Sequence, residues 1–172
     1  MRKLLDALYD GAAWLAALLM IGVLVMVMLS IISRLIGFHV PGTDAYAGYS
    51  MAGAGFMALA HTLKRGEHIR VTLLIGALKG SMRRALEMWS LVLASALAWL
   101  FAFYSCRLAW QSKMFNDIST GNDATPLWIP QIGMAVGTVM LAIAFLDDLL
   151  LMSLGRPVAR LAKHSQEPAH ME

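Results

Sequence analysis

Residues 11–33 read "GAAWLAALLMIGVLVMVMLSIIS" and contain no charged side chain. At a rise of about 1.5 Å per residue, this run forms a helix of roughly 34 Å, which is long enough to cross a hydrocarbon core. In lipid the backbone amides must be satisfied internally, so we expect a helix. Arg2 and Lys3 precede the run, as they would in a signal peptide. The run is too long for that interpretation, however, and no clear small-x-small cleavage site follows it.

The rest of the chain repeats this pattern three times. With 59% hydrophobic and 15% charged residues, a soluble domain of 172 residues could not hide its apolar surface. We predict an all-α membrane protein with one transmembrane domain over residues 1–155 and a polar, disordered cytoplasmic tail over 156–172. Pro126 and Pro130 suit the first turn of the last helix. The predicted spans cover about 11–35, 44–64, 84–112 and 126–150.

The distribution of basic residues predicts the orientation. Of the 14 Lys and Arg residues, only Arg34, Arg107 and Lys113 fall on the side opposite the termini. Because basic residues stay cytoplasmic, both termini are expected in the cytoplasm. Residues 71–80, "VTLLIGALKG", are too short to cross the membrane, and we expect a short interfacial helix at about 70–79 on the cytoplasmic side.

The distribution of reactive side chains argues against an enzyme and against a resident cofactor. No two histidines share a level that would hold haem, and no spacing suggests zinc. The central thirds of the four runs lack acids and bases, so we do not expect this chain to carry a solute by itself. Asp147 and Asp148 are expected to be a solvated helix end. Cys106, the single cysteine, is expected to be buried and structural.

Two groups of residues are candidates for architectural roles. Arg34 and Asp44 bracket the short joint "RLIGFHVPGTD", which would allow them to pair or to be solvated separately. Small residues at spacings of three, four and three form a predicted helix-packing face. This face would pack within the chain or against a second membrane protein, and the sequence does not separate the two. Its members are Ala45, Gly48, Ala52 and Gly55.

Two polar segments carry the remaining candidates. "HTLKRGEHIR", residues 61–70, looks like a cytoplasmic joint in which Gly66 lets the second helix end. The predicted structural joints comprise Arg34, Asp44, Gly66, Glu67, His68 and Arg70. Residues 116–131, "NDISTGNDATPLWIPQ", form a turn-rich loop on the opposite side, where partners often dock. Its predicted docking residues are Asn116, Asp117, Ser119, Thr120, Asp123 and Trp128.

Taken together, these segments resemble the small membrane subunit of tripartite ATP-independent periplasmic (TRAP) transporters. The likeness is carried by Arg34, by Asp44, by the block "GEHIRV" at 66–71, and by "PLWIPQIG" leading into the last span. The chain departs from many members of the family in having a single acid in "GTDA" and Thr72 after "HIRV", which indicates a subfamily.

The resemblance implies a non-catalytic subunit of a sodium-coupled, binding-protein-dependent importer of organic acids in the bacterial inner membrane. Its partners would be a large multi-span membrane subunit, which binds the solute and the sodium ions, and a periplasmic solute-binding protein. The small subunit would act as a static brace and offer part of the docking surface. The alternative is a membrane anchor subunit of a respiratory oxidoreductase, which would hold haem or a quinone.

Overall fold

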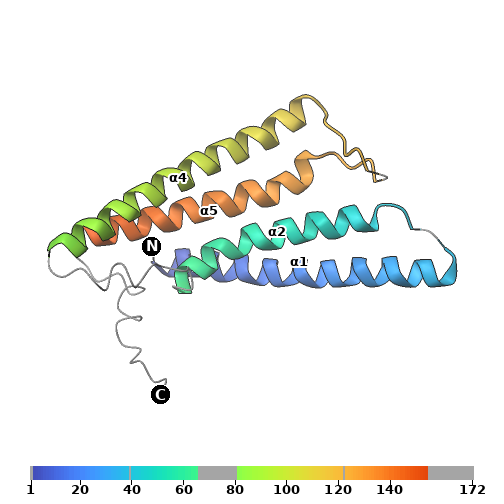
Figure 1. The fold of residues 1–172 in the computed structure, drawn as a ribbon, viewed down its shortest axis with the longest axis horizontal. Coiled ribbons are helices and arrows are strands. Elements are labelled where there is room, and N and C mark those ends of the chain that lie inside the picture. Colours follow the sequence, from blue (N-terminus) through green and yellow to red (C-terminus); the bar gives the residue numbers. More distant parts are fainter. Residues whose placement is uncertain (1, 39, 66–80, 122, 155–172) are drawn as a thin grey trace, which may run out of the picture.

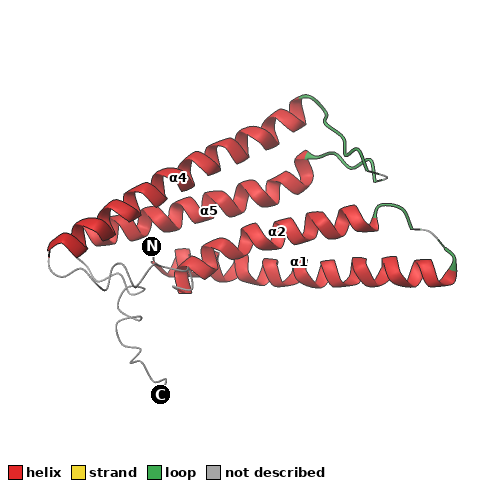
Figure 2. Ribbon diagram, viewed as in Figure 1, coloured by secondary structure: helices red, strands yellow, loops and turns green. Residues whose placement is uncertain are grey.

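A computed structural model of the protein describes all residues except 1, 39, 66–80, 122 and 155–172. The described residues form four helices, and the only strand-like pairing among them is an isolated bridge between Ile118 and Pro126 (Figure 2). The prediction of an all-helical fold is confirmed. The helices are α1 (Arg2–Ile36), α2 (Thr43–Arg65), α4 (Ser81–Met114) and α5 (Trp128–Ser153). The expectation for Pro126 is wrong, because this residue precedes α5 and takes part in the bridge.

Three of the four predicted spans are long and apolar enough to cross a membrane. They lie in α1, α4 and α5, over Asp6–Ile36, Arg84–Met114 and Trp128–Ser153. Helix α2 forms where it was expected. It is rich in glycine, alanine and polar residues, however, and it is not among the helices that are long and apolar enough to cross a membrane. A crossing by α2 therefore stays a prediction, as does the location of the termini. The interfacial helix expected at 70–79 and the tail expected from 156 lie outside the described residues.

The helices lie across the molecule in the order α1, α2, α5, α4 (Figure 1). Helix α1 packs along α2, α2 along α5, and α5 along α4. The start of α1, the end of α2, the start of α4 and the end of α5 share one end of the molecule. The other end carries the two connections 37–42 and 115–127, and we call it the paired-loop end. Helices α1 and α4 are the outer edges of this arrangement.

Small residues let the inner helices approach closely. A Cβ atom placed on Gly133 of α5 would lie 3.4 Å from the Cα of Gly53 in α2. One placed on Gly137 would lie 2.5 Å from the backbone of Phe56. On the other side of α5, Ala142 is fully buried with Ala98 and Ala102 of α4. Such seams suit helices in lipid, where close packing rather than the hydrophobic effect drives association.

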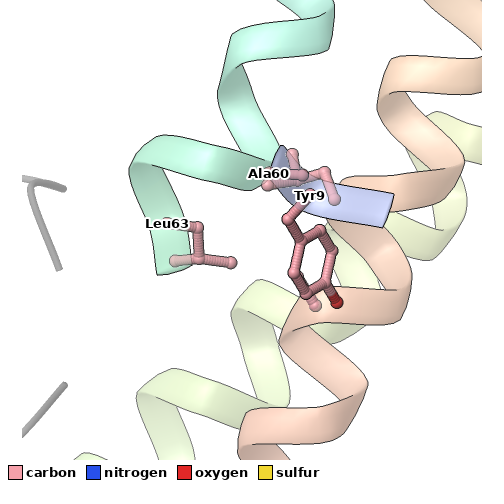
Figure 3. Close-up of a cluster of buried hydrophobic side chains, with 5 residues drawn as sticks. Tyr9, Ala60 and Leu63 are labelled. Carbon is pink, nitrogen blue, oxygen red and sulfur yellow. The ribbon is translucent and has the colours of Figure 1, made fainter. Parts of the chain in front are cut away.

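A buried cluster joins α1, α2 and α5 at the end opposite the paired loops. Tyr9 of α1 is 2% exposed and lies beside Ala60 and Leu63 of α2 (Figure 3). Leu141 and Ala144 of α5 complete the cluster. It fixes the start of α1 against the two inner helices.

Two expectations about single residues are wrong. Asp148 is 2% exposed, because it follows Leu141 and Ala144 on the buried face of α5 rather than at a solvated end. Asp147, its neighbour, is half-buried. Cys106 is exposed, because it lies away from the seam between α4 and α5.

Candidate functional site

The joint between α1 and α2 brings Arg34 and Asp44 together. Arg34 Nη2 lies 3.5 Å from Asp44 Oδ2, and Ser30 Oγ donates a hydrogen bond of 3.3 Å to Asp44 Oδ1. The pair, which the sequence left open, is therefore present. Both side chains are mostly exposed, so the ion pair itself stabilises the joint by no more than about 1 kcal/mol.

The backbone makes this joint compact. Gly37 has a φ of +77°, and the N–H groups of Gly37 and Phe38 donate to the carbonyl oxygens of Arg34 and Ser33. These two bonds form a Schellman motif, which ends α1 with a glycine in the left-handed conformation. Asp44 then falls in the first turn of α2, where the helix dipole favours an acid.

The loop between α4 and α5 is ordered by its own hydrogen bonds. Asn116, with a φ of +52°, lies two residues after the end of α4, and the N–H of Asp117 donates to the carbonyl of Ser112. The N–H of Ser119 donates to the carbonyl of Thr125, and that of Leu127 to the carbonyl of Asp117. The two sides of the loop are therefore held together across the bridge at 118 and 126.

The carboxylate of Asp123 connects this loop to α2. It accepts hydrogen bonds from Ser119 Oγ at 2.8 Å and from the hydroxyl of Tyr49 at 3.0 Å. Hydrogen bonding by Thr125 is the main reason why the pKa of Asp123 falls from 3.8 to about 2. Burial opposes this change, while the hydrogen bonds from Ser119 and Tyr49 add to it. Asp123 therefore holds the loop as a charged hydrogen-bond acceptor.

A second contact runs alongside the first. Thr125 Oγ1 and the Tyr46 hydroxyl are hydrogen-bonded at 3.2 Å, and the rings of Tyr46 and Tyr49 pack edge to face with centroids 6.2 Å apart. Gly42, at a φ of +84°, faces Asp123 so closely that an added Cβ would lie 3.0 Å from the Asp123 Cβ. The two loops and the first turns of α2 thus form one connected structure, which we call the periplasmic-loop platform, after its expected location. It comprises Gly42, Tyr46, Tyr49, Ser119, Asp123 and Thr125.

The predicted docking residues divide into two groups. Ser119 and Asp123 are used inside the platform, and Trp128 is half-buried with the Lys113 Nζ atom 5.5 Å from its ring centroid. The others are exposed: Asn116, Asp117 and Thr120. Sequence reasoning missed Tyr46 and Tyr49 as partners of the loop. Their spacing of three placed them on one face of α2, but nothing in the sequence indicated which loop they meet.

Most of the small-residue face of α2 is open in the part of the chain that the structure describes. Gly48, Ala52 and Gly55 are exposed, and a Cβ added to either glycine would meet no atom within 4 Å. Ala45 is half-buried. Internal packing uses a different side of α2, where the buried residues include Gly53, Ala54, Met57, Ala60 and Leu63. Gly48, Ala52 and Gly55 therefore make no close contact with the described part of the chain, and the role of this face stays a prediction.

The other predicted joint residues, Gly66, Glu67, His68 and Arg70, lie outside the described residues. Near them, His61 Nδ1 of α2 lies 3.7 Å from Asp10 Oδ1 of α1, a contact that sequence reasoning did not identify. Within the described part of the chain, no group of three or more His, Cys, Asp or Glu side chains is placed to hold a metal ion.

Comparison with protein families gives a match over residues 23–154, about three quarters of the chain. The matching family is described as "Tripartite ATP-independent periplasmic transporters, DctQ component". A search among curated proteins gives no match. The match covers both connections of the paired-loop end and all of α2, α4 and α5. It does not favour the alternative of a respiratory anchor subunit. The chain belongs to the DctQ family, the small membrane component of tripartite ATP-independent periplasmic transporters.

Proposed function

We propose that this chain is a non-catalytic scaffold subunit, which braces the large membrane subunit of a sodium-coupled importer of organic acids. The solute and the sodium ions would bind to the large subunit, and this chain would hold no cofactor. Both termini would lie in the cytoplasm of a bacterium, with the paired-loop end in the periplasm.

The observation that carries this proposal is the exposed small-residue face of α2. Helix α2 lies between two apolar spans, α1 and α5, yet it turns Gly48, Ala52 and Gly55 outward. A surface without large apolar side chains makes few van der Waals contacts with lipid chains, whereas the backbone of another helix can approach it closely. Because this chain belongs to a family of transporter components, we propose that a helix of the large subunit covers this face of α2.

The periplasmic-loop platform supports the second part of the proposal, docking of the solute-binding protein. Its internal contacts leave Asn116, Asp117 and Thr120 exposed on a loop that is fixed to α2. A surface that is already ordered loses less conformational entropy when a partner binds. The loop is therefore suited to present these side chains to a second protein.

Co-purification of the two membrane subunits tests the scaffold role. Replacing Gly55 by Leu should reduce recovery of the large subunit at least severalfold, because the added side chain fills the helix contact. Gly11→Leu is the matched control, since Gly11 is an exposed helical glycine of α1 that also has no atom within 4 Å of an added Cβ. Full recovery with Gly55→Leu would contradict the assignment of this face.

Reconstitution tests the transporter role itself. Liposomes that contain this chain alone should take up no organic acid, whereas adding the large subunit, the binding protein and a sodium gradient should produce uptake. Uptake by this chain alone would overturn the proposal.

A further inference from the structure

The outer edge of α4 carries a stripe of exposed side chains that the scaffold role does not use. Successive members are separated alternately by four and three residues, so they share one face of the helix. The opposite side of α4 buries Ala98, Ala102 and Ser105, of which the two alanines pack with α5. The stripe therefore faces away from the other described helices. Its members are Leu93, Leu97, Leu100, Tyr104, Arg107 and Gln111.

The polarity of this stripe changes along the helix. Its first three members are leucines, between 47% and 57% exposed, and its last three are polar or amphipathic. Arg107 comes six residues before Lys113, which lies over Trp128 at the start of α5. Six residues correspond to about 9 Å of helix, which puts Arg107 close to the paired-loop end of the span. Apolar side chains thus lead from the middle of the span to one guanidinium near its end.

Arg107 has no counter-ion within the part of the chain that the structure describes. The ion pairs between Arg34 and Asp44 and between His61 and Asp10 do not involve it. A cation on the outer surface of a membrane helix is costly unless it reaches an anion or the interface. The planar guanidinium presents its donors in a fork that matches phosphate oxygens.

The side chains of the stripe favour a lipid over a second helix. Helices that associate in membranes use small residues at their contact, as the exposed face of α2 does. The stripe on α4 contains no Gly, Ala or Ser, and its leucines offer a surface for acyl chains. Exposed Trp110, three residues beyond Arg107, is a residue type that favours the level of the head groups.

We propose that this stripe binds a phospholipid with an anionic head group. Arg107 donates hydrogen bonds to the phosphate, and Tyr104 and Gln111 flank the head group. The acyl chains lie along Leu93, Leu97 and Leu100. The positive charge of Arg107 has no ion-pair partner among the described residues, so it favours lipids with a net negative charge over zwitterionic ones.

Tryptophan quenching by brominated lipids tests the proposal, because Trp110 lies one turn from Arg107. The full chain is reconstituted with brominated phosphatidylglycerol or with brominated phosphatidylcholine at equal mole fractions. Wild-type protein should prefer the phosphatidylglycerol about fivefold, as expected for one basic residue near an anionic lipid. Trp110→Phe should remove most of the additional quenching by phosphatidylglycerol.

Two variants with the same change of charge decide the role of Arg107. Arg107→Gln should abolish the preference without lowering helix content in circular dichroism, since the side chain is exposed. Lys113→Gln, on another face of α4, should keep the preference. Equal quenching by the two lipids in wild type would overturn the proposal, and so would equal losses in the two variants. The proposal would also fail if Arg107→Gln kept the lipid preference but released the large subunit, because a partner helix would then cover the stripe.

Discussion

Asp123 shows how the sequence can place a side chain in a loop without revealing the contacts that it makes. The polar loop 116–131 predicted exposed docking residues, and Asp123 was among them. In the structure its carboxylate faces inward to Tyr49, which is 74 positions away in sequence. Local patterns cannot reveal such a contact, because it depends on α2 and α5 packing side by side. Arg34 and Asp44 were easier to place, since a short joint limits how far apart they can lie.

The hydrogen bonds of Asp123 predict an acid-sensitive loop. The folded-state pKa is lowered from 3.8 to about 2, so the contribution of Asp123 to stability is complete above pH 3.8. This contribution is lost as the pH falls through the folded pKa of about 2. Amide hydrogen exchange at Ser119 and Leu127, corrected for its intrinsic pH dependence, should therefore speed up over this range. In Asp123→Asn the same amides should exchange severalfold faster at neutral pH and lack the acid-induced step. A step of the same size in the variant would contradict the role of Asp123.

Two glycines with positive φ separate backbone strain from steric contact. Gly37→Ala should cost about 1 kcal/mol, because alanine disfavours the left-handed conformation at φ +77° while its Cβ meets nothing. Gly42→Ala carries the same strain at φ +84° and also presses on Asp123. It should therefore lower the thermal unfolding midpoint further than Gly37→Ala does. Equal midpoints for the two variants would show that the loops are less tightly packed than the structure indicates.

At the scale of the helix, α2 explains why periodicity located the helices but not their contacts. Two of its sides carry small residues: Gly48, Ala52 and Gly55 on one, and Gly53 with Ala60 on the other. Either pattern is compatible with close helix packing, so the sequence could not show which one the chain uses internally. The facing helix determines which side is used, because Gly133 and Gly137 of α5 pack against Gly53 and Phe56 of α2. Likewise, the doublet of Asp147 and Asp148 predicted a helix end, and only the register with Leu141 and Ala144 shows that Asp148 is buried.

The glycines of the α2–α5 seam predict a graded response to added methyl groups. Gly137→Ala should destabilise the chain by about 1–3 kcal/mol, since its Cβ would lie 2.5 Å from the Phe56 backbone, which cannot rotate away. Gly133→Ala meets Gly53 at 3.4 Å and should have a smaller effect. Gly48→Ala, in open space, should leave the stability of the isolated chain unchanged or slightly higher. Denaturation in detergent, followed by circular dichroism, measures all three variants, and the reverse order would rule out this seam.

At the scale of the whole molecule, the order α1, α2, α5, α4 leaves two outer helices and one outward face of α2 available to partners and lipid. Hydrophobic run lengths predicted the four long helices that the structure describes. The lateral order depends on which faces match, and it could not be derived from the lengths. The first apolar run, residues 11–33, carries no charged side chain. Such a run is consistent with a subunit that supports transport without binding the solute.

The alternating directions and the distribution of basic residues together predict that α2 crosses the membrane, although it is less apolar than the other three helices. Single cysteines in a Cys106→Ala background test this topology with a membrane-impermeant maleimide. Pro41→Cys and Thr120→Cys lie on exposed positions of the two paired loops and should be labelled in intact cells whose outer membrane is permeable to the reagent. Met82→Cys, 69% exposed in the native side chain at the start of α4, should be labelled only after the inner membrane is opened. If α2 did not cross, residue 82 would move to the outside and residue 120 to the inside, while residue 41 would stay outside. Labelling at 41 and 82 without labelling at 120 would therefore reject the four-span topology, and with it the periplasmic location of the platform built on Asp123.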